Sequence, residues 1–303
     1  MKNIIIIVVV LALAVTGYVV LTKKPSAPVT KSPTEEVTTI KDPIPVQKPV
    51  AKAPVDSTRT VLGKSVAGNQ ITAYHFGTGE KELLFVGGIH GGYEWNTVLV
   101  AYELMDYLKA NPNNIPKNVK VTVIPVLNPD GLKRVVGTTE QFSPTDVSKT
   151  DSVIVSGRFN ENTVDLNRNF DCDWKQAGVW QKNKVSGGTS AFSEPESKAM
   201  KDYVEATKPT AVVIWYSAGG GVFASNCHNG VSKETNTLTK TFAIASGYKA
   251  YQSFDFYETT GDMANWLAKI NTPAISVLLT THKDTEWKKN QLGVEALLQY
   301  YAQ

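Results

Sequence analysis

The amino-acid sequence predicts an α/β fold, a single three-layer sandwich with a mixed, mostly parallel β-sheet. Segments with the pattern of strands alternate along the chain with segments of helical periodicity. Some of the predicted strands are short and continuously apolar, as in KELLFVGG at residues 81–88, which is typical of strands inside a sheet. The chain has 303 residues, of which 42% are hydrophobic, and this is enough for one domain with a large core.

The strands are predicted from apolar runs that end at turn residues. NQITAYHFG alternates between polar and apolar residues and ends at Gly77, while NVKVTVIPVL runs into Asn128-Pro129-Asp130-Gly131, a strong turn signal. PTAVVIWYSAGGG has the pattern of a buried strand that runs into glycines. We therefore expect strands at residues 69–77, 81–88, 118–127, 209–221 and 272–280.

The helices are predicted from apolar residues at helical spacing and from their boundary signals. EWNTVLVAYELMDYLKAN has this spacing and ends near Asn111-Pro112, and SEPESKAMKDYVEAT opens with a capping signature. KETNTLTKTFAIASG stops at a glycine, and EWKKNQLGVEALLQYYA is the closing helix. Between these elements, residues 138–164 are polar and irregular.

The first 24 residues are expected to lie outside this fold. Residues 4–21 are continuously apolar and have lysines on both sides, and as a helix they would be roughly 27 Å long, close to the thickness of a bilayer core. The alternative is a cleaved signal peptide, but the apolar run ends without a small-x-small cleavage site. We favour an uncleaved helix that anchors the protein in a membrane.

A tether is predicted to join this segment to the folded part. Residues 25–57 hold seven of the fifteen prolines and show no periodicity, which indicates an extended linker, so that 58–303 form the α/β domain. Such an arrangement favours a membrane-anchored, extracytoplasmic domain, with a secreted protein as the alternative. Cys172 and Cys227 could then form a disulfide, or they are two buried thiols. The net charge of +3, with no concentrated basic stripe, does not suggest nucleic-acid binding.

His90 and Glu94 stand out because glycines surround them at the end of a predicted strand. Glycine lets the backbone turn sharply and lets a ligand approach closely. A neutral imidazole and a carboxylate four residues apart can supply two ligands to zinc. The alternative is a turn histidine, with Glu94 interacting favourably with the dipole of the following helix.

The segment VDLNRNFDCDW is a second candidate site. Arg168 offers a planar fork of donors that matches a carboxylate, and Asn167 adds a neutral donor beside it. Asp165 and Asn169 flank the pair. A loop of this composition is a plausible anion pocket, and the alternative is a polar turn with a surface salt bridge.

From about Ser65 to its end, the chain resembles the zinc carboxypeptidases of the carboxypeptidase A type. GGIHGGYEW is similar to the first zinc motif of that family, PVLNPDG to its strand end, and DLNRNFD to its substrate loop. YETTGDMANW is similar to the segment that carries the tyrosine covering the substrate. The four motifs occur in the family's order, which implies the family's fold.

The resemblance also implies roles for individual residues. His90 and Glu94 would bind zinc, and Asn167 with Arg168 would hold the free carboxylate of a peptide's C-terminal residue. Arg158 would polarise the scissile carbonyl and stabilise the oxyanion. Three further residues would complete the substrate pocket: Tyr257 as its cover, Ala264 near its base, and Asp262 at its rim, where it would suit an amino-bearing substrate such as a cell-wall peptide.

The chain departs from the family at two positions that carry the chemistry. Tyr216 stands where the family has its third zinc ligand, a histidine, and Leu278 stands where it has the glutamate that acts as general base. His90 and Glu94 are also separated by three residues instead of two, which a glycine-rich turn can absorb. Among the other histidines, His228 is the better candidate for a replacement ligand, and His282 a poorer one.

Two functions therefore remain open. One is a pseudopeptidase that binds peptides with free C-terminal carboxylates, has little or no zinc, and has lost turnover because a catalytic zinc needs three protein ligands and the general base contributes roughly 10²–10⁴-fold. The other is an active zinc metallocarboxypeptidase with unusual ligands. The two substitutions favour the first.

Overall fold

The computed structural model describes residues 58–303. The predicted membrane anchor at 1–24 and the predicted linker at 25–57 lie outside the described residues. Within 58–303, no helix is both long enough and apolar enough to cross a membrane.

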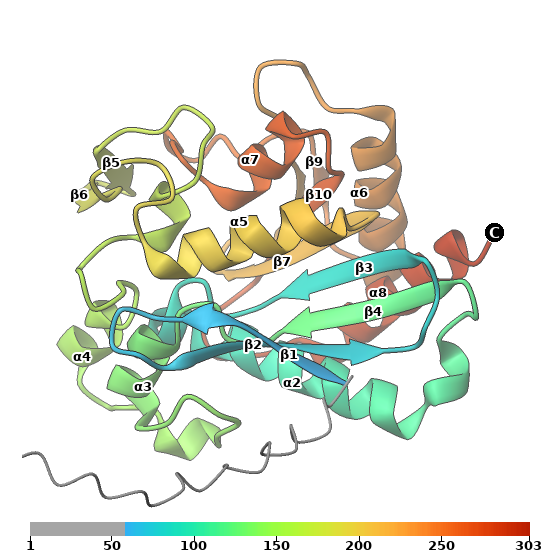
Figure 1. The fold of residues 1–303 in the computed structure, drawn as a ribbon, viewed down its shortest axis with the longest axis horizontal. Coiled ribbons are helices and arrows are strands. Elements are labelled where there is room, and N and C mark those ends of the chain that lie inside the picture. Colours follow the sequence, from blue (N-terminus) through green and yellow to red (C-terminus); the bar gives the residue numbers. More distant parts are fainter. Residues whose placement is uncertain (1–57) are drawn as a thin grey trace, which may run out of the picture. The chain divides into compact units, whose positions relative to one another are not determined.

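An eight-stranded sheet runs through the centre of the domain, in the order β1-β2-β4-β3-β7-β10-β8-β9 (Figure 1). The four central strands are parallel to one another, and the pairs β1–β2, β2–β4 and β10–β8 are antiparallel. The sheet is therefore mixed and mostly parallel, as the sequence predicts. Its strands are β1 (Arg59–Lys64), β2 (Gln70–Phe76), β3 (Lys81–Val86), β4 (Val119–Ile124), β7 (Ala211–Ser217), β8 (Gly221–Ala224), β9 (Ala250–Tyr251) and β10 (Ala274–Leu279).

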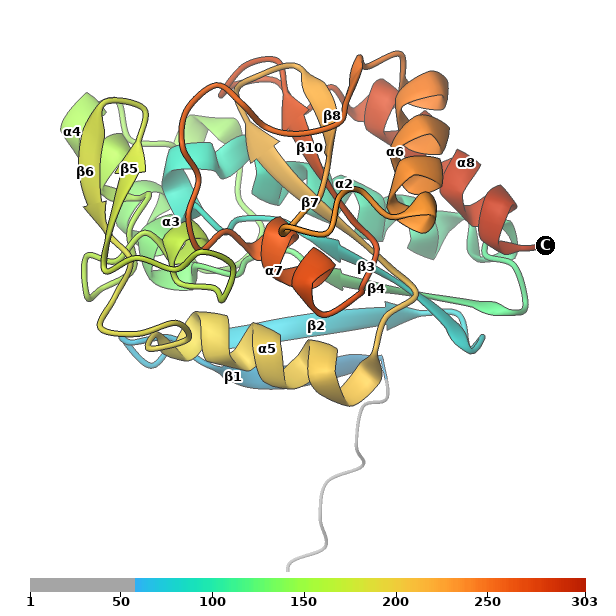
Figure 2. The same ribbon diagram turned by 90° about the horizontal axis from the view of Figure 1, so that it is seen from above.

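Helices cover both faces of this sheet and give two separate hydrophobic cores (Figure 2). In β3, Leu83 and Phe85 point into one core while Leu84 and Val86 point into the other, which is the alternation expected of a strand buried on both faces. The first core packs under α2 (Trp95–Ala110), α3 (Pro129–Val136), α6 (Lys233–Ser246) and α8 (Trp287–Tyr301), and the second under α5 (Pro195–Thr207) and α7 (Met263–Lys269).

The structure corrects the prediction of a turn at Asn128-Pro129-Asp130-Gly131. These residues begin helix α3: Asn128 is its N-cap, with Oδ1 accepting a hydrogen bond of 2.9 Å from the Gly131 amide, and Pro129 is its first residue. Asparagine at the N-cap and proline at the first position start helices as readily as they form turns.

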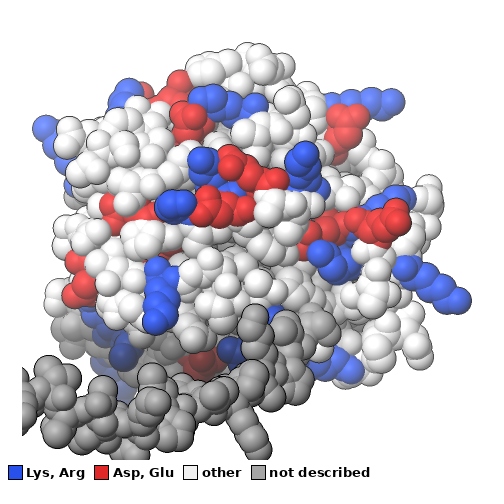
Figure 3. All heavy atoms as spheres, viewed as in Figure 1, with Lys and Arg blue, Asp and Glu red and all other residues white. Residues whose placement is uncertain are grey.

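Several short elements have no counterpart in the predicted pattern. The irregular segment 138–164 contains helix α4 (Asp151–Ser156), and a small hairpin of β5 (Ala177–Trp180) and β6 (Asn183–Ser186) follows it. Elements this short present too few residues to establish a period. On the face of the domain in Figure 3, basic and acidic side chains are interspersed and do not gather by sign.

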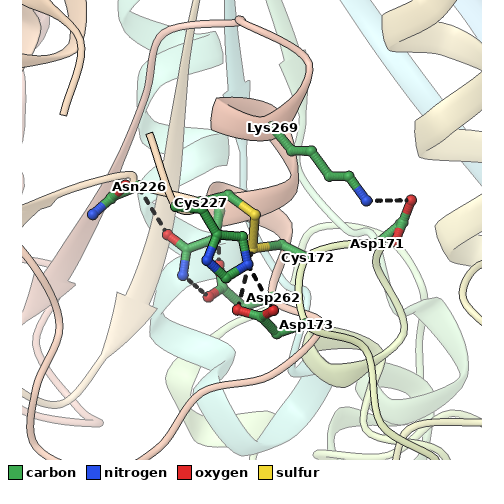
Figure 4. The surroundings of a disulfide bond; sticks show 9 residues. Asp171, Cys172, Asp173, Asn226, Cys227, Asp262 and Lys269 are labelled. Atoms are coloured by element: carbon green, nitrogen blue, oxygen red, sulfur yellow. Dashed lines mark hydrogen bonds and ion pairs between the residues drawn. A yellow bond between two sulfur atoms is a disulfide. The ribbon is translucent and has the colours of Figure 1, made fainter. Parts of the chain in front are cut away.

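Cys172 and Cys227 form a disulfide with Cα atoms 6.2 Å apart, which confirms that they are close enough to bridge. Figure 4 shows the bond beside Asp262, and the Gly261 amide donates a hydrogen bond of 2.6 Å to the Cys172 carbonyl. His228 lies next to the bond, but sulfurs that are joined to each other are not thiolate ligands, so this group is no metal site. The disulfide therefore links the loop that follows Arg168 to the segment that follows β8.

Removing this disulfide should destabilise the domain. The bond closes a loop with a sequence separation of 55 residues, so the Cys172→Ser/Cys227→Ser variant should lose about 2–4 kcal/mol of unfolding free energy. Urea unfolding of the oxidised protein, the reduced protein and the double variant measures this. Equal midpoints for all three would show that the bond contributes nothing.

Candidate functional site

The ten residues to which the family resemblance gives a role or an altered position all line one pocket of about 420 Å³. The pocket lies beyond the carboxyl ends of the parallel strands β3, β7 and β10, which is where ligands bind in open α/β sheets. The ten are His90, Glu94, Arg158, Asn167, Arg168, Tyr216, Tyr257, Asp262, Ala264 and Leu278.

The glycines beside His90 are required by close packing. Gly91 has φ +46°, and a Cβ atom on it would lie 2.7 Å from the Gly157 carbonyl oxygen. A Cβ on Gly92 would lie 2.3 Å from the Cβ of Val135 in α3. Only glycine therefore allows the turn to lie against α3 and α4 and to direct His90 into the pocket.

The extra residue between His90 and Glu94 is absorbed in a short 3₁₀ turn over Gly91–Glu94. His90 Nδ1 lies 2.9 Å from Glu94 Oε1, and both residues are only 3% exposed. Neither nitrogen of His90 has a partner in hydrogen-bond geometry, and Glu94 Oε2 has none either. The two side chains thus converge as a pair of metal ligands would.

Asp165 is a buried carboxylate beside His90, and its sequence position indicates only that it flanks Asn167 and Arg168. Its Oδ1 lies 3.4 Å from His90 Nε2, and its Oδ2 accepts hydrogen bonds from Arg158 Nε at 2.9 Å and Nη2 at 2.8 Å. Burial raises the pKa of Asp165, but the neighbouring Arg158 and His90 outweigh burial and hold it well below the usual range. Asp165 is therefore ionised and sets the positions of both neighbours.

At the third-ligand position the donor set does not fit a catalytic zinc. Tyr216 is 5% exposed, its ring centroid lies 5.7 Å from that of His90, and its hydroxyl donates a hydrogen bond of 3.1 Å to Asn167 Oδ1. Burial, and then the charge of Asp262, raise the pKa of Tyr216 well above 10. A neutral phenol that donates its proton to Asn167 is a poor zinc ligand, so Tyr216 as placed does not supply the third donor that a catalytic zinc needs.

The general-base position is equally unsuited to proton transfer. Leu278 lies on β10 directly opposite Tyr216 of β7 in the parallel ladder. A Cβ on Gly219 would lie 2.6 Å from Leu278 Cδ2, so the leucine is packed tightly against the loop that follows β7. An aliphatic side chain can neither accept nor release a proton.

The groups that would bind a carboxylate are intact. Arg168 is 1% exposed, and its guanidinium donates to the carbonyls of Asn167 at 2.6 Å and Val179 at 2.7 Å, which fixes its plane. Asn167 Oδ1 accepts from both Tyr216 and the Met263 amide, so its Nδ2 group is left to donate to a ligand. These two residues give the pocket fixed donors for an anion.

Two further residues line the same part of the pocket. The ring of Tyr257 lies 5.9 Å from Arg168 Cζ, and burial raises its pKa, so its phenol is protonated and able to donate at neutral pH. Asp262 is the N-cap of α7: its Oδ1 accepts from the Asn265 amide at 2.9 Å and its Oδ2 from Asn265 Nδ2 at 2.6 Å. Burial raises the pKa of Asp262.

Some pocket residues carried no signal in the sequence. Trp180, from the short hairpin, stacks with its ring 4.5 Å from Arg158 Cζ. His282 lines the pocket, although the sequence favours His228 as the replacement zinc ligand. His228 lies outside the pocket, is largely exposed, and has its Nε2 atom 2.8 Å from Asp173 Oδ1. A single histidine in a polar loop after a strand forms no sequence motif from which a place in the pocket could be predicted.

A family model described as zinc carboxypeptidase matches residues 47–291. Because this match covers most of the sequence, the chain belongs to the zinc carboxypeptidase family. Zinc is the metal of that family. The resemblance to carboxypeptidases that the motifs indicate is thereby confirmed.

Individual relatives match over part of their length. The chain is 26% identical over 156 residues to a zinc carboxypeptidase of Simulium vittatum, covering 49% of each. It is 26% identical over 190 residues to carboxypeptidase M of Mus musculus, covering 58% of this chain and 37% of the relative. It is also 29% identical over 154 residues to bacteriocin BCN5 of Clostridium perfringens, covering 50% and 15%. Each match thus spans about half or less of the relative.

Solved structures share the fold. The murein-tripeptide amidase MpaA of Escherichia coli O157 superposes with a TM-score of 0.56 at 20% identity, covering 80% of this chain and 91% of that one. The carboxypeptidase A of Helicoverpa armigera gives a TM-score of 0.62 at 18% identity, covering 81% and 67%. At these identities the comparison shows the fold alone.

Replacing Asp165 should change both stability and its dependence on pH. Asp165→Asn removes the closer of the two buried counter-charges of Arg158 and leaves Glu94 at 3.8 Å, so unfolding free energy at pH 7 should fall by about 3 kcal/mol. Because the folded pKa is depressed, the carboxylate stabilises the fold above its unfolded pKa of about 3.9, and this contribution is lost as pH falls below that value.

Urea unfolding between pH 7 and pH 2 measures both effects. The wild type should lose stability steeply in acid, and the variant should lose less. Glu161→Gln, which breaks the surface pair with Arg134, is the matched control and should cost less than about 1 kcal/mol. Parallel pH profiles for wild type and Asp165→Asn would contradict the assignment.

Proposed function

We propose that this protein is a membrane-tethered member of its family that binds peptides through their free C-terminal carboxylate and has lost most or all turnover. One observation carries the proposal. The residues for binding a carboxylate are in place and oriented, while Tyr216 and Leu278 occupy the positions at which the family has its third ligand and its base.

The binding step follows from the charges in the pocket. A peptide carboxylate would receive charge-assisted hydrogen bonds from Arg168 and a neutral bond from Asn167 Nδ2, with the Tyr257 hydroxyl as a further donor. The last peptide carbonyl would lie near Arg158, whose Nη1 lies 3.8 Å from Glu94 and is not committed to Asp165. These fixed donors are oriented before a ligand arrives, which reduces the entropy cost of binding.

The sequence, the disulfide and the shared fold support the proposed location of the protein and the proposed class of ligand. The apolar segment at 4–21 and the proline-rich linker would hold the domain outside a membrane, or a cleaved leader would release it. A disulfide suits an oxidising extracytoplasmic compartment. The shared fold with a murein-tripeptide amidase makes cell-wall peptides one class of ligand worth testing.

Binding should require both the free carboxylate and Arg168. Titration calorimetry should detect an acetylated tripeptide with a free carboxylate and little or no binding of its C-terminal amide. Arg168→Met should weaken binding of the free acid by at least about tenfold, because hydrogen bonds to charged groups contribute about 1.5–3 kcal/mol. Arg134→Met, on the surface, is the matched control. Equal affinity for acid and amide would refute the proposal.

The second candidate is an active zinc metallocarboxypeptidase with unusual ligands, favoured by the 2.9 Å approach of His90 Nδ1 and Glu94 Oε1. Metal analysis and peptide hydrolysis separate the two. We expect the purified protein to hold far less than one equivalent of zinc and to hydrolyse C-terminal residues slowly or not at all.

Restoring both missing groups should recover zinc binding and some turnover. The variant Tyr216→His/Leu278→Glu supplies a third ligand and a base, and each change alone should recover little because metal and base act together. A wild-type protein with one equivalent of zinc and ordinary carboxypeptidase rates would instead establish the second candidate.

A further inference from the structure

His282 is a pocket residue with no role in the proposed function so far. It follows strand β10, is half-buried, and lines the same pocket as Arg158 and Glu94. Its ring packs against that of Tyr93, with centroids 4.8 Å apart. Its Nδ1 atom lies 3.0 Å from the hydroxyl oxygen of Ser217, the last residue of β7.

A chain of hydrogen bonds fixes which nitrogen of His282 carries the proton. Asn96 is fully buried, and its Nδ2 donates to the carbonyls of Thr281 at 2.7 Å and Asp284 at 3.0 Å. The opposite amide orientation would place its oxygen against two carbonyl oxygens. Asn96 Oδ1 therefore faces Ser217 and accepts its hydroxyl proton at 3.0 Å.

The direction of the remaining bond follows. A serine hydroxyl has one proton, and that of Ser217 is given to Asn96, so its oxygen can only accept from His282 Nδ1. Neutral His282 then carries its proton on Nδ1 and has a free lone pair on Nε2. Within residues 58–303, Nε2 has no hydrogen-bond partner in the protein, and the residue lines the pocket. Nε2 of His282 is therefore a fixed hydrogen-bond acceptor in the pocket, which the aliphatic side chain of Leu278 cannot be.

We propose that His282 contacts the bound peptide and accepts a hydrogen bond at Nε2 from a backbone N–H of the ligand, with Ser217 and Asn96 as the positioning residues. The inference rests on the proposed peptide-binding function and adds a group that contacts the peptide backbone upstream of its carboxylate.

The order of side chains along the pocket supports this assignment. Arg168 lies beside Tyr257 at the end that would hold the carboxylate. Arg158 Cζ lies 5.7 Å from the centroid of the Tyr93 ring, and the His282 ring contacts the same Tyr93 ring with centroids 4.8 Å apart. A peptide that extends from Arg168 past Arg158 would place upstream peptide bonds near His282, and each of these bonds carries an N–H donor.

The tautomer can be tested without any ligand. Imidazole ¹⁵N chemical shifts of the wild-type domain should show a protonated Nδ1 and an unprotonated Nε2 for His282. Ser217→Ala removes the acceptor of the Nδ1 proton and should shift the ring toward a mixture of tautomers. A wild-type His282 protonated on Nε2 would overturn the proposal.

The contact can be tested with a pair of peptides. One is an acetylated tripeptide with a free carboxylate, and the other is the same peptide N-methylated at its backbone amides. His282→Phe should bind the first about three- to tenfold more weakly than wild type, which corresponds to one ordinary hydrogen bond, and should bind the second as wild type does. His228→Gln, at an exposed site outside the pocket, is the matched control.

The outcomes separate this inference from the proposed function. An equal loss for both peptides, or no loss for either, would contradict a hydrogen bond from the ligand to His282. If the wild type binds the free acid and its C-terminal amide equally, the proposed function fails, and the ¹⁵N measurement still decides the tautomer.

Discussion

The buried carboxylate of Asp165 is the interaction on which the rest of the site depends. Its Oδ2 forms an ion pair with Arg158, and its Oδ1 faces His90. Oδ1 also accepts a hydrogen bond of 3.0 Å from the backbone N–H of Asn167. One fully buried charge thus sets the position of the imidazole, of the guanidinium, and of the loop that carries Arg168. A charge in that environment is tolerated only when it is paired and hydrogen-bonded, so these neighbours must stay where they are.

In the function that we propose, a binding pocket differs from a catalytic one at two side chains on adjacent strands. Tyr216 and Leu278 face each other across the β7–β10 ladder, so the third-ligand and base positions are neighbours in the fold. The Tyr216 hydroxyl donates its proton to Asn167 Oδ1 and thereby fixes the side chain that would hold a carboxylate. The hydroxyl of Tyr216 therefore also helps to fix the loop that carries Asn167 and Arg168.

Much of this fold could be predicted from sequence, because buried parallel strands such as β3 leave a continuous apolar run and helices such as α2 contain apolar residues at helical spacing. The pocket residues named by the motifs were also brought together, since motif order and strand ends determine which side chains meet at the sheet edge. The structure alone showed that Asn128 begins a helix, because its hydrogen bond to Gly131 satisfies either a turn or an N-cap.

Residues that act through distant contacts left no signal. Asn96 and Ser217 are 121 residues apart, and Ser217 and His282 are 65 apart. Hydrogen bonds between residues so distant in the chain leave no pattern in the sequence. The role of Asp165 was missed for the same reason, because its partner His90 lies on a different segment of the chain. Short elements such as the β5–β6 hairpin, which brings Trp180 against Arg158, lack the length to be predicted.

A crystal structure of the domain grown with excess zinc and a C-terminal peptide would test the central claim most directly. The account predicts an intact peptide whose carboxylate lies on Arg168 and Asn167, with Tyr216 still bonded to Asn167 and no fully coordinated zinc. A zinc ion held by His90, Glu94 and a third protein ligand, together with a cleaved peptide, would contradict it.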